Sequence, residues 1–109
     1  MQNEKKVYAS LSLAKKAGKI ESGGFATENA VKGGKAFFVL VARDASDNTK
    51  KMFRNMCDYY EVPYVIFGAG EELGHAIGRE FRVSMAVTDE GFARMIKKQL
   101  CSEGIGGNE

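Results

Sequence analysis

Seven consecutive apolar residues, Ala36–Ala42, form the segment that most constrains the fold of this chain. They follow Gly33-Gly34 and Lys35 and stop at Arg43-Asp44, so the run has the length of a strand and falls well short of the roughly 20 residues that a membrane span needs. A strand that is apolar on both of its faces must be covered on both sides. The segment therefore predicts a central strand between two layers of helices.

The rest of the chain alternates between helical and strand-like segments. Helical spacing of apolar residues, with glycines at the expected helix ends, predicts helices over 4–17, 25–32, 48–60, 71–77 and 90–100. Short apolar stretches predict strands over 19–22, 36–42, 64–67 and 83–88. Such alternation indicates an α/β protein with one sheet and helices on both of its faces, although the order of the strands cannot be read from the sequence.

Patterning also predicts the core and the helix caps. The helix over 48–60 should bury one stripe, which consists of Met52, Phe53, Met56, Cys57 and Tyr60. Phe37 lies in the apolar run and is expected in the core. Ser46 or Asp47 is placed to cap the helix over 48–60, and Asp89 to cap the last helix, because a side-chain oxygen there can accept an unpaired backbone N–H.

Composition allows one domain, predicted over 1–101, followed by a glycine-rich tail over 102–109 that is expected to be disordered. The first residues lack the apolar stretch of a signal peptide, which favours the cytoplasm. The net charge of +2 is uneven: residues 1–60 carry +5 and residues 61–109 carry −3. A basic first half favours contact with polyanions, although scattered solvated lysines would look the same.

Signals for catalysis and for metal binding are weak. His75 is the only histidine, and no nucleophile or second titrating group accompanies it. Cys57 and Cys101 have no zinc-ligand spacing, and the carboxylates fall at caps or on outer helix faces. Gly68-Ala69-Gly70 opens a helix but lacks the spacing of a dinucleotide fingerprint. We therefore expect no enzyme, no metal and no cofactor.

Gly23-Gly24 opens a helix in a basic neighbourhood. Backbone N–H groups at a helix start, together with nearby lysines, suit a phosphate backbone, although a simple turn would have the same sequence. Phe25 and Phe81 stand beside glycine or arginine, where a ring can stack on a base or anchor in the core. Both interpretations remain open for each residue.

Three segments together resemble one protein family. They are LSLAKKAGKIESG (11–23), GKAFFVLVARDAS (34–46) and EELGHAIG (71–78). They resemble the ribosomal protein L7Ae/L30e superfamily and its bacterial YlxQ-like branch, over roughly residues 5–100. The resemblance implies a three-layer α/β/α sandwich with a mixed four-stranded sheet. It also implies RNA binding, because many members bind kink-turn RNA.

In those members a helix begins at a Gly-x-Asn-Glu segment with a lysine three residues later. The Asn and Glu read sheared guanines, the lysine meets the backbone, and a loop before the last strand closes over flipped-out bases. The corresponding positions here are Gly23, Phe25, Ala26 and Asn29, and the loop is 78–83. The chain thus departs from the pattern at all three reading positions, so we expect backbone and stacking contacts with altered specificity.

The fold is expected to gather the loop cations around this helix start. The predicted RNA-binding residues are Lys16, Lys19, Gly23, Gly24, Phe25, Asn29, Arg43, Lys50, Arg79, Phe81 and Arg82. We expect a monomer that binds structured RNA, including ribosomal RNA, in the ribosome or another ribonucleoprotein, with no membrane contact. The alternative is a protein-interaction module that kept the fold and lost the RNA site.

Overall fold

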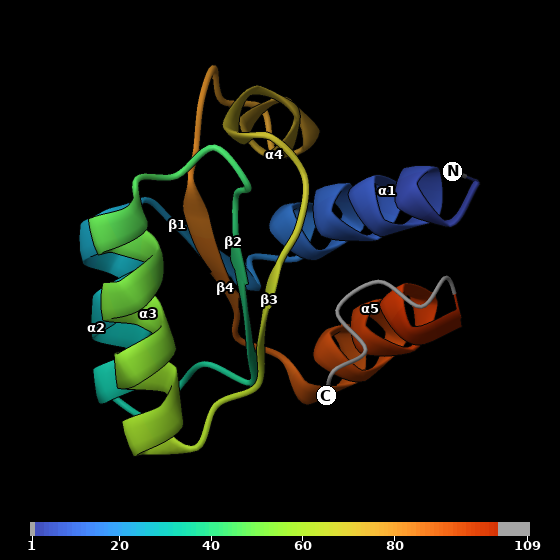
Figure 1. Cartoon of the computed structure of the whole chain (residues 1–109). Coiled ribbons are helices and arrows are strands. Elements are labelled where there is room, and N and C mark those ends of the chain that lie inside the picture. Colours follow the sequence, from blue (N-terminus) through green and yellow to red (C-terminus); the bar gives the residue numbers. More distant parts are fainter. Residues whose placement is uncertain (1, 103–109) are drawn as a thin grey trace.

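A computed structural model describes residues 2–102 of the chain, which form one four-stranded sheet and five helices (Figure 1). The elements are α1 (Gln2–Lys16), β1 (Ile20–Ser22), α2 (Gly24–Lys32), β2 (Phe38–Val41), α3 (Asp47–Tyr60), β3 (Tyr64–Ile66), α4 (Gly70–Ala76), β4 (Ser84–Val87) and α5 (Glu90–Ser102). All nine predicted elements are present in the predicted order. Beyond Ser102, the tail expected over 102–109 lies outside the described residues.

The sheet is mixed, with the strand order β1-β4-β2-β3. The last strand, β4, lies between β1 and β2 and is antiparallel to both, whereas β2 and β3 are parallel. Hence β1, β2 and β3 all point toward the same end of the sheet, and β4 starts there. That end is at the top of Figure 1.

Helices cover both faces of the sheet, which confirms the α/β/α sandwich. Phe38 and Leu40 of β2, and Ala42 directly after it, face a core shared with α1, α4 and α5. The intervening Val39 and Val41 face a second core, to which α2 and α3 contribute. Every residue of β2 is buried, as expected for a central strand with covered faces.

Three residues expected in the core are exposed instead: Phe37, Met52 and Tyr60. Phe53 and Cys57 fill the centre of the buried stripe of α3, and both have no exposed surface. Met52 and Tyr60 lie at the margins of that stripe. Phe37 immediately precedes β2, at the end of the sheet opposite to the start of β4.

The expected helix caps are present. The Thr49 backbone N–H donates to Ser46 Oγ at 3.1 Å, which makes Ser46 the cap of α3. The Phe92 N–H donates to Asp89 Oδ2 at 2.9 Å before α5. Within residues 2–102, the helices are too short or too polar to cross a membrane.

Candidate nucleic-acid interface

Four segments that lie far apart in the sequence meet at one end of the sheet: 23–25, 43–46, 68–70 and 78–83 (top of Figure 1). We call these four segments the upper end of the sheet. Strand pairing brings them together, because Val41 at the end of β2 is opposite Ser84 at the start of β4 and Ile66 at the end of β3. The Gly23 N–H donates to the Ser84 carbonyl at 2.9 Å, which brings the start of α2 to the same place.

The start of α2 carries unpaired backbone donors. Gly23 precedes it with φ of 93°, a conformation that L-residues with a Cβ rarely adopt. The first N–H groups of a helix have no intrahelical acceptor. Among the described residues no side chain caps α2, whereas α3 is capped by Ser46 and the Gly70 N–H of α4 donates to Asp44. The first turn of α2 also has no acidic residue, so it presents free donors to an anion.

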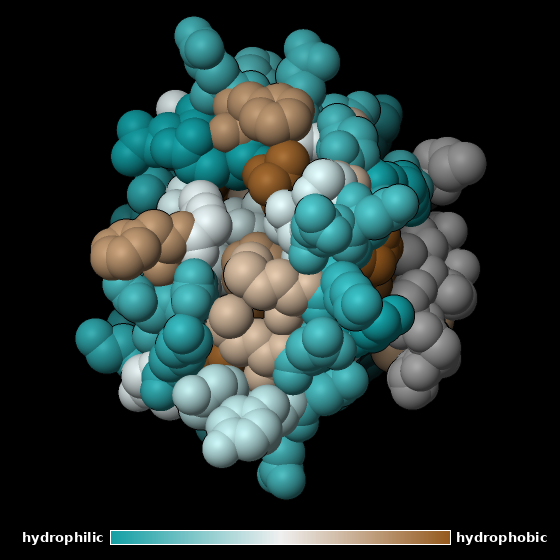
Figure 2. All heavy atoms as spheres, turned by 60° about the vertical axis from the view of Figure 1, so that its left-hand side comes forward, coloured by the Kyte–Doolittle hydropathy of each residue, from teal (hydrophilic) through white to brown (hydrophobic). Residues whose placement is uncertain are grey.

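Two phenylalanine rings are exposed near this helix start. Phe25 lies in the first turn of α2 and is 80% exposed. Phe81 lies in the segment 78–83 and is 51% exposed, because its ring packs closely on Gly70 of α4. Of the two interpretations left open by the sequence, core anchoring is thus wrong for Phe25, and Phe81 is anchored against α4 but stays about half exposed. Figure 2 views the α2/α3 side, where apolar groups project among hydrophilic ones.

Arg82 is held beside the start of α2. Its Nε donates to Ser22 Oγ at 3.1 Å, and Nη1 donates to the Phe81 carbonyl at 2.8 Å. A Cβ built on Gly23 would lie 3.9 Å from Arg82 Nε. These hydrogen bonds use two of the five N–H donors of the guanidinium, and the others can meet a phosphate.

Three further predicted cations belong to the upper end. Arg79 is exposed in the segment 78–83. Lys50 lies in the first turn of α3, next to the upper end, and its N–H donates to the Ser46 carbonyl at 2.9 Å. Arg43 lies over the Phe67 ring, with its Cζ 5.7 Å from the ring centroid. Asn29 is exposed one turn after Phe25 on α2, so both lie on the same side of that helix.

Lys16 and Lys19 are not gathered with the others, and the expectation that the fold brings them to the helix start is wrong. Lys19 lies just before β1, and its carbonyl accepts from the Thr88 N–H after β4 at 2.9 Å. Gly23 lies after the other end of β1. Because a strand is extended, consecutive positions move apart by roughly 3.3 Å, which separates Lys19 from Gly23 although only three positions lie between them.

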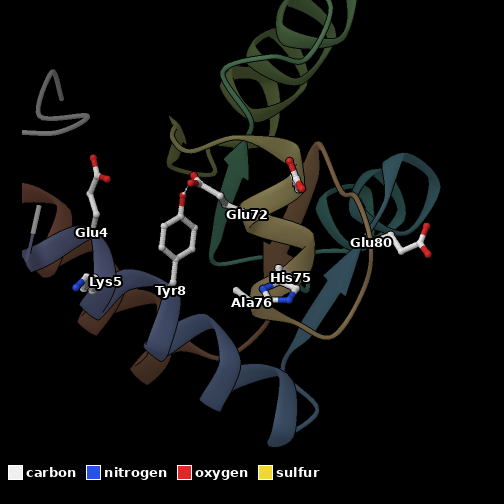
Figure 3. A pocket seen from close by; sticks show the side chains of 8 residues that line it. Glu4, Lys5, Tyr8, Glu72, His75, Ala76 and Glu80 are labelled. Atoms are coloured by element: carbon white, nitrogen blue, oxygen red, sulfur yellow. Dashed lines mark hydrogen bonds between the residues drawn. The ribbon is translucent and has the colours of Figure 1, made fainter.

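A hollow of about 1010 Å³ lies elsewhere, between α1 and α4 (Figure 3). Its lining is mainly acidic and consists of Glu4, Lys5, Tyr8, Glu71, Glu72, His75, Ala76 and Glu80. The Tyr8 hydroxyl donates to Glu72 Oε1 at 3.0 Å. Burial and this carboxylate raise the pKa of Tyr8. The four carboxylates repel a phosphate backbone, so this hollow does not suit RNA.

Metal ligands do not cluster in the described part of the chain: no group of three or more His, Cys, Asp or Glu side chains is placed to hold an ion. His75 is exposed. Cys57 is buried and Cys101 exposed, and they are not bonded to one another.

Sequence reasoning missed the contacts of three residues in or next to the upper end: Asp44, Gly70 and Gly74. Asp44 was expected at a cap or on an outer helix face, and it does cap a helix, but the partner was not foreseen: it accepts from the Gly70 N–H of α4 at 2.9 Å across 26 positions. Gly70 and Gly74 both contact Phe81. The four-residue spacing of the two glycines was the available signal, since it places both on one side of α4.

Comparisons with known proteins agree with this architecture. The model of the ribosomal protein L7Ae/L30e/S12e/Gadd45 family matches residues 5–97. A protein named RNA-binding protein YlxQ from Bacillus subtilis (strain 168) is 42% identical over 86 residues, which cover 79% of this chain and 86% of that protein. A protein of the same name from Enterococcus faecium is 36% identical over 98 residues, covering 90% of this chain and 94% of that protein.

Solved structures share the fold. A protein of unknown function from Bacillus halodurans has a TM-score of 0.85 at 32% identity, over 88% of this chain and 97% of that one. The Giardia lamblia 15.5kD RNA binding protein has a TM-score of 0.78 at 19% identity, over 94% and 88%, and shows the fold alone. The curated relatives are named as binding proteins and not as enzymes, in agreement with the prediction from the sequence. From the family match and these identities, the chain belongs to the ribosomal protein L7Ae/L30e/S12e/Gadd45 family.

Proposed function

We propose that this protein binds structured RNA at the upper end of the sheet, without enzymatic activity. The observation that carries the proposal is the uncapped start of α2, with Arg82 on one side and the exposed ring of Phe25 in its first turn. The names of the two curated relatives, both RNA-binding proteins, support it. Ribosomal RNA is the partner class we favour; a monomeric state and a cytoplasmic location stay predictions.

The mode of binding combines three kinds of contact. The free N–H groups of the first turn of α2 donate to phosphate oxygens. Arg79 and Arg82 neutralise phosphates, which makes binding sensitive to salt. The rings of Phe25 and Phe81 stack on unpaired bases, a contact that tolerates every base because each has a π-face.

Sequence preference follows from the residues at the reading positions. Phe25 and Ala26 stand where kink-turn binders of the family carry Asn and Glu. Neither side chain can hydrogen-bond to a base edge, so the protein loses readout of sheared guanines and keeps stacking and phosphate contacts. We propose that it prefers RNA with unpaired, accessible bases over any particular base sequence.

Fluorescence anisotropy with two labelled RNAs tests this function: a kink-turn hairpin, and the same hairpin with its sheared G·A pairs replaced by Watson–Crick pairs flanking an unpaired loop. We expect salt-sensitive binding to both at micromolar protein or below, with similar affinities. The double variant Phe25→Asn/Ala26→Glu should recover a preference for the kink-turn. No salt-sensitive binding to either RNA would overturn the proposal.

Matched substitutions test stacking. Phe25→Ala removes an exposed ring at the upper end, and Phe37→Ala removes an exposed ring at the opposite end of the sheet. Stacking on one base is worth about 1–3 kcal/mol, so Phe25→Ala should weaken binding at least about fivefold while Phe37→Ala leaves it unchanged. Equal effects would refute the stacking contact. Co-purification of one stoichiometric protein after nuclease treatment, with no RNA binding, would favour the interaction module instead.

A further inference from the structure

Phe81 is seated on α4 by two glycines. A Cβ added at Gly70 would lie 2.7 Å from both Cε1 and Cζ of the Phe81 ring. A Cβ added at Gly74 would lie 2.7 Å from the Phe81 backbone nitrogen and 2.8 Å from its Cα. Such distances are too short for real carbon contacts, so only glycine lets the segment 78–83 lie this close to α4. The Phe81 ring is thereby packed against α4 while the residue stays about half exposed.

Gly70 also binds both neighbouring segments through its backbone. Its N–H donates to Asp44 Oδ1 at 2.9 Å, and its carbonyl accepts from the Arg82 N–H at 2.9 Å. Asp44 thus holds the first residue of α4, and that residue holds both Phe81 and Arg82. The three contacts link the segment 43–46 to the segment 78–83 through one glycine.

Asp44 is an unexpected neighbour for a phosphate-binding surface, because its negative charge repels the ligand. Its geometry supplies a reason for its presence: the side chain caps the start of α4. Capping satisfies an otherwise unpaired N–H and fixes the position of the first turn. If Asp44 favours RNA binding, it must do so through Gly70, and this effect must be larger than the repulsion between its charge and the phosphates.

We propose that Asp44 is a positioning residue of the RNA site, which acts through Gly70 to hold Phe81 and Arg82 where they meet RNA. The inference rests on the proposed function for its ligand. If Asp44 acts by positioning, its loss should weaken RNA binding. If only its negative charge mattered, its loss should strengthen RNA binding.

Two substitutions of Asp44 separate positioning from charge. Asp44→Asn keeps an oxygen that can accept from the Gly70 N–H, and Asp44→Ala does not; both remove the negative charge. We expect Asp44→Ala to weaken RNA binding about fivefold, which corresponds to the typical cost of a lost cap, and Asp44→Asn to bind as well as the unmodified protein or more tightly. Equal affinities of the two variants, or tighter binding by Asp44→Ala, would overturn the proposal.

Asp47→Ala is the matched control for charge. Asp47 is an exposed carboxylate in the first turn of α3, three positions after Asp44. Its removal should leave RNA affinity unchanged or slightly raised. A loss as large as that of Asp44→Ala would mean that any acidic residue of this region matters, and would count against a role through Gly70.

Amide hydrogen exchange tests the positioning without RNA, so it distinguishes failure of this inference from failure of the proposed function. In Asp44→Ala the Arg82 N–H should exchange at least about threefold faster than in Asp44→Asn, while amides of β2 and β4 keep their rates. Gly70→Ala, which displaces the Phe81 ring, should accelerate the same amide. Unchanged exchange of the Arg82 N–H in both Asp44→Ala and Gly70→Ala would refute the coupling, whatever the RNA measurements give.

Discussion

Replacing Arg82 by alanine removes a guanidinium that is held beside the start of α2 by hydrogen bonds to Ser22 and Phe81. Each phosphate neutralised by a protein contributes roughly 0.7–0.9 to the slope of log affinity against log salt concentration. Between about 50 and 200 mM salt, loss of one such contact makes the affinity fall about threefold less than it does for the unmodified protein. Affinity itself should also drop at low salt.

Fluorescence anisotropy at four salt concentrations measures this slope. Two further variants serve as controls for the charge and for its position. Arg82→Lys keeps the charge and should keep the slope, but it loses the two-point anchorage and should bind more weakly. Lys19→Ala removes a cation at the other end of β1, so its slope should equal that of the unmodified protein. An unchanged slope for Arg82→Ala, or an equal reduction for Lys19→Ala, would refute the assignment of phosphate contacts to the upper end.

Three other predictions concern the fold that carries the site. Phe53→Ala removes a ring with no exposed surface and should cost about 3–5 kcal/mol of unfolding free energy in urea titrations; a loss under about 1 kcal/mol would contradict the assigned packing. Ser46→Ala removes the α3 cap and should lower the unfolding free energy by about 1 kcal/mol, whereas Ser46→Asp keeps a cap and should leave it nearly unchanged. Burial raises the pKa of the Cys57 thiol to about 12, so at pH 8 it stays protonated and mass spectrometry should find iodoacetamide on the exposed Cys101 alone. In denaturant both cysteines should react, and modification of Cys57 in the folded protein would contradict its burial.

Local patterns in the sequence were sufficient to predict the elements. The apolar run 36–42 indicated a strand with two covered faces, and the structure buries every residue of β2. Ser46 and Asp89 cap the helices that they were expected to cap. Each of these features depends on residues within a few positions of one another, which is why it can be recognised in the sequence.

The pairing of distant strands could not be predicted from the sequence. Insertion of β4 between β1 and β2 depends on contacts between segments more than forty positions apart, and no local pattern encodes it. That pairing decides which end of β1 meets the segment 78–83. Lys16 and Lys19 were therefore expected at the site although they lie at the other end of β1.

Contacts between the loops were equally hidden. Asp44 reads as an ordinary polar turn residue, and its partner Gly70 is the first residue of α4, 26 positions away. Gly70 reads as a turn glycine, whereas the structure uses its lack of a Cβ for close approach of Phe81. A residue that positions a segment distant in the sequence has no local pattern by which a single sequence could reveal it.

Nuclear magnetic resonance titration of the ¹⁵N-labelled protein with a structured RNA tests the central claim most directly, because it locates the contact surface residue by residue. The account predicts that the amide signals of residues 23–25 and 78–83 shift most, and that those of Lys19 and Thr88 at the other end of the sheet stay in place. Shifts confined to α1 and α5, or no shifts at RNA concentrations up to the millimolar range, would contradict it.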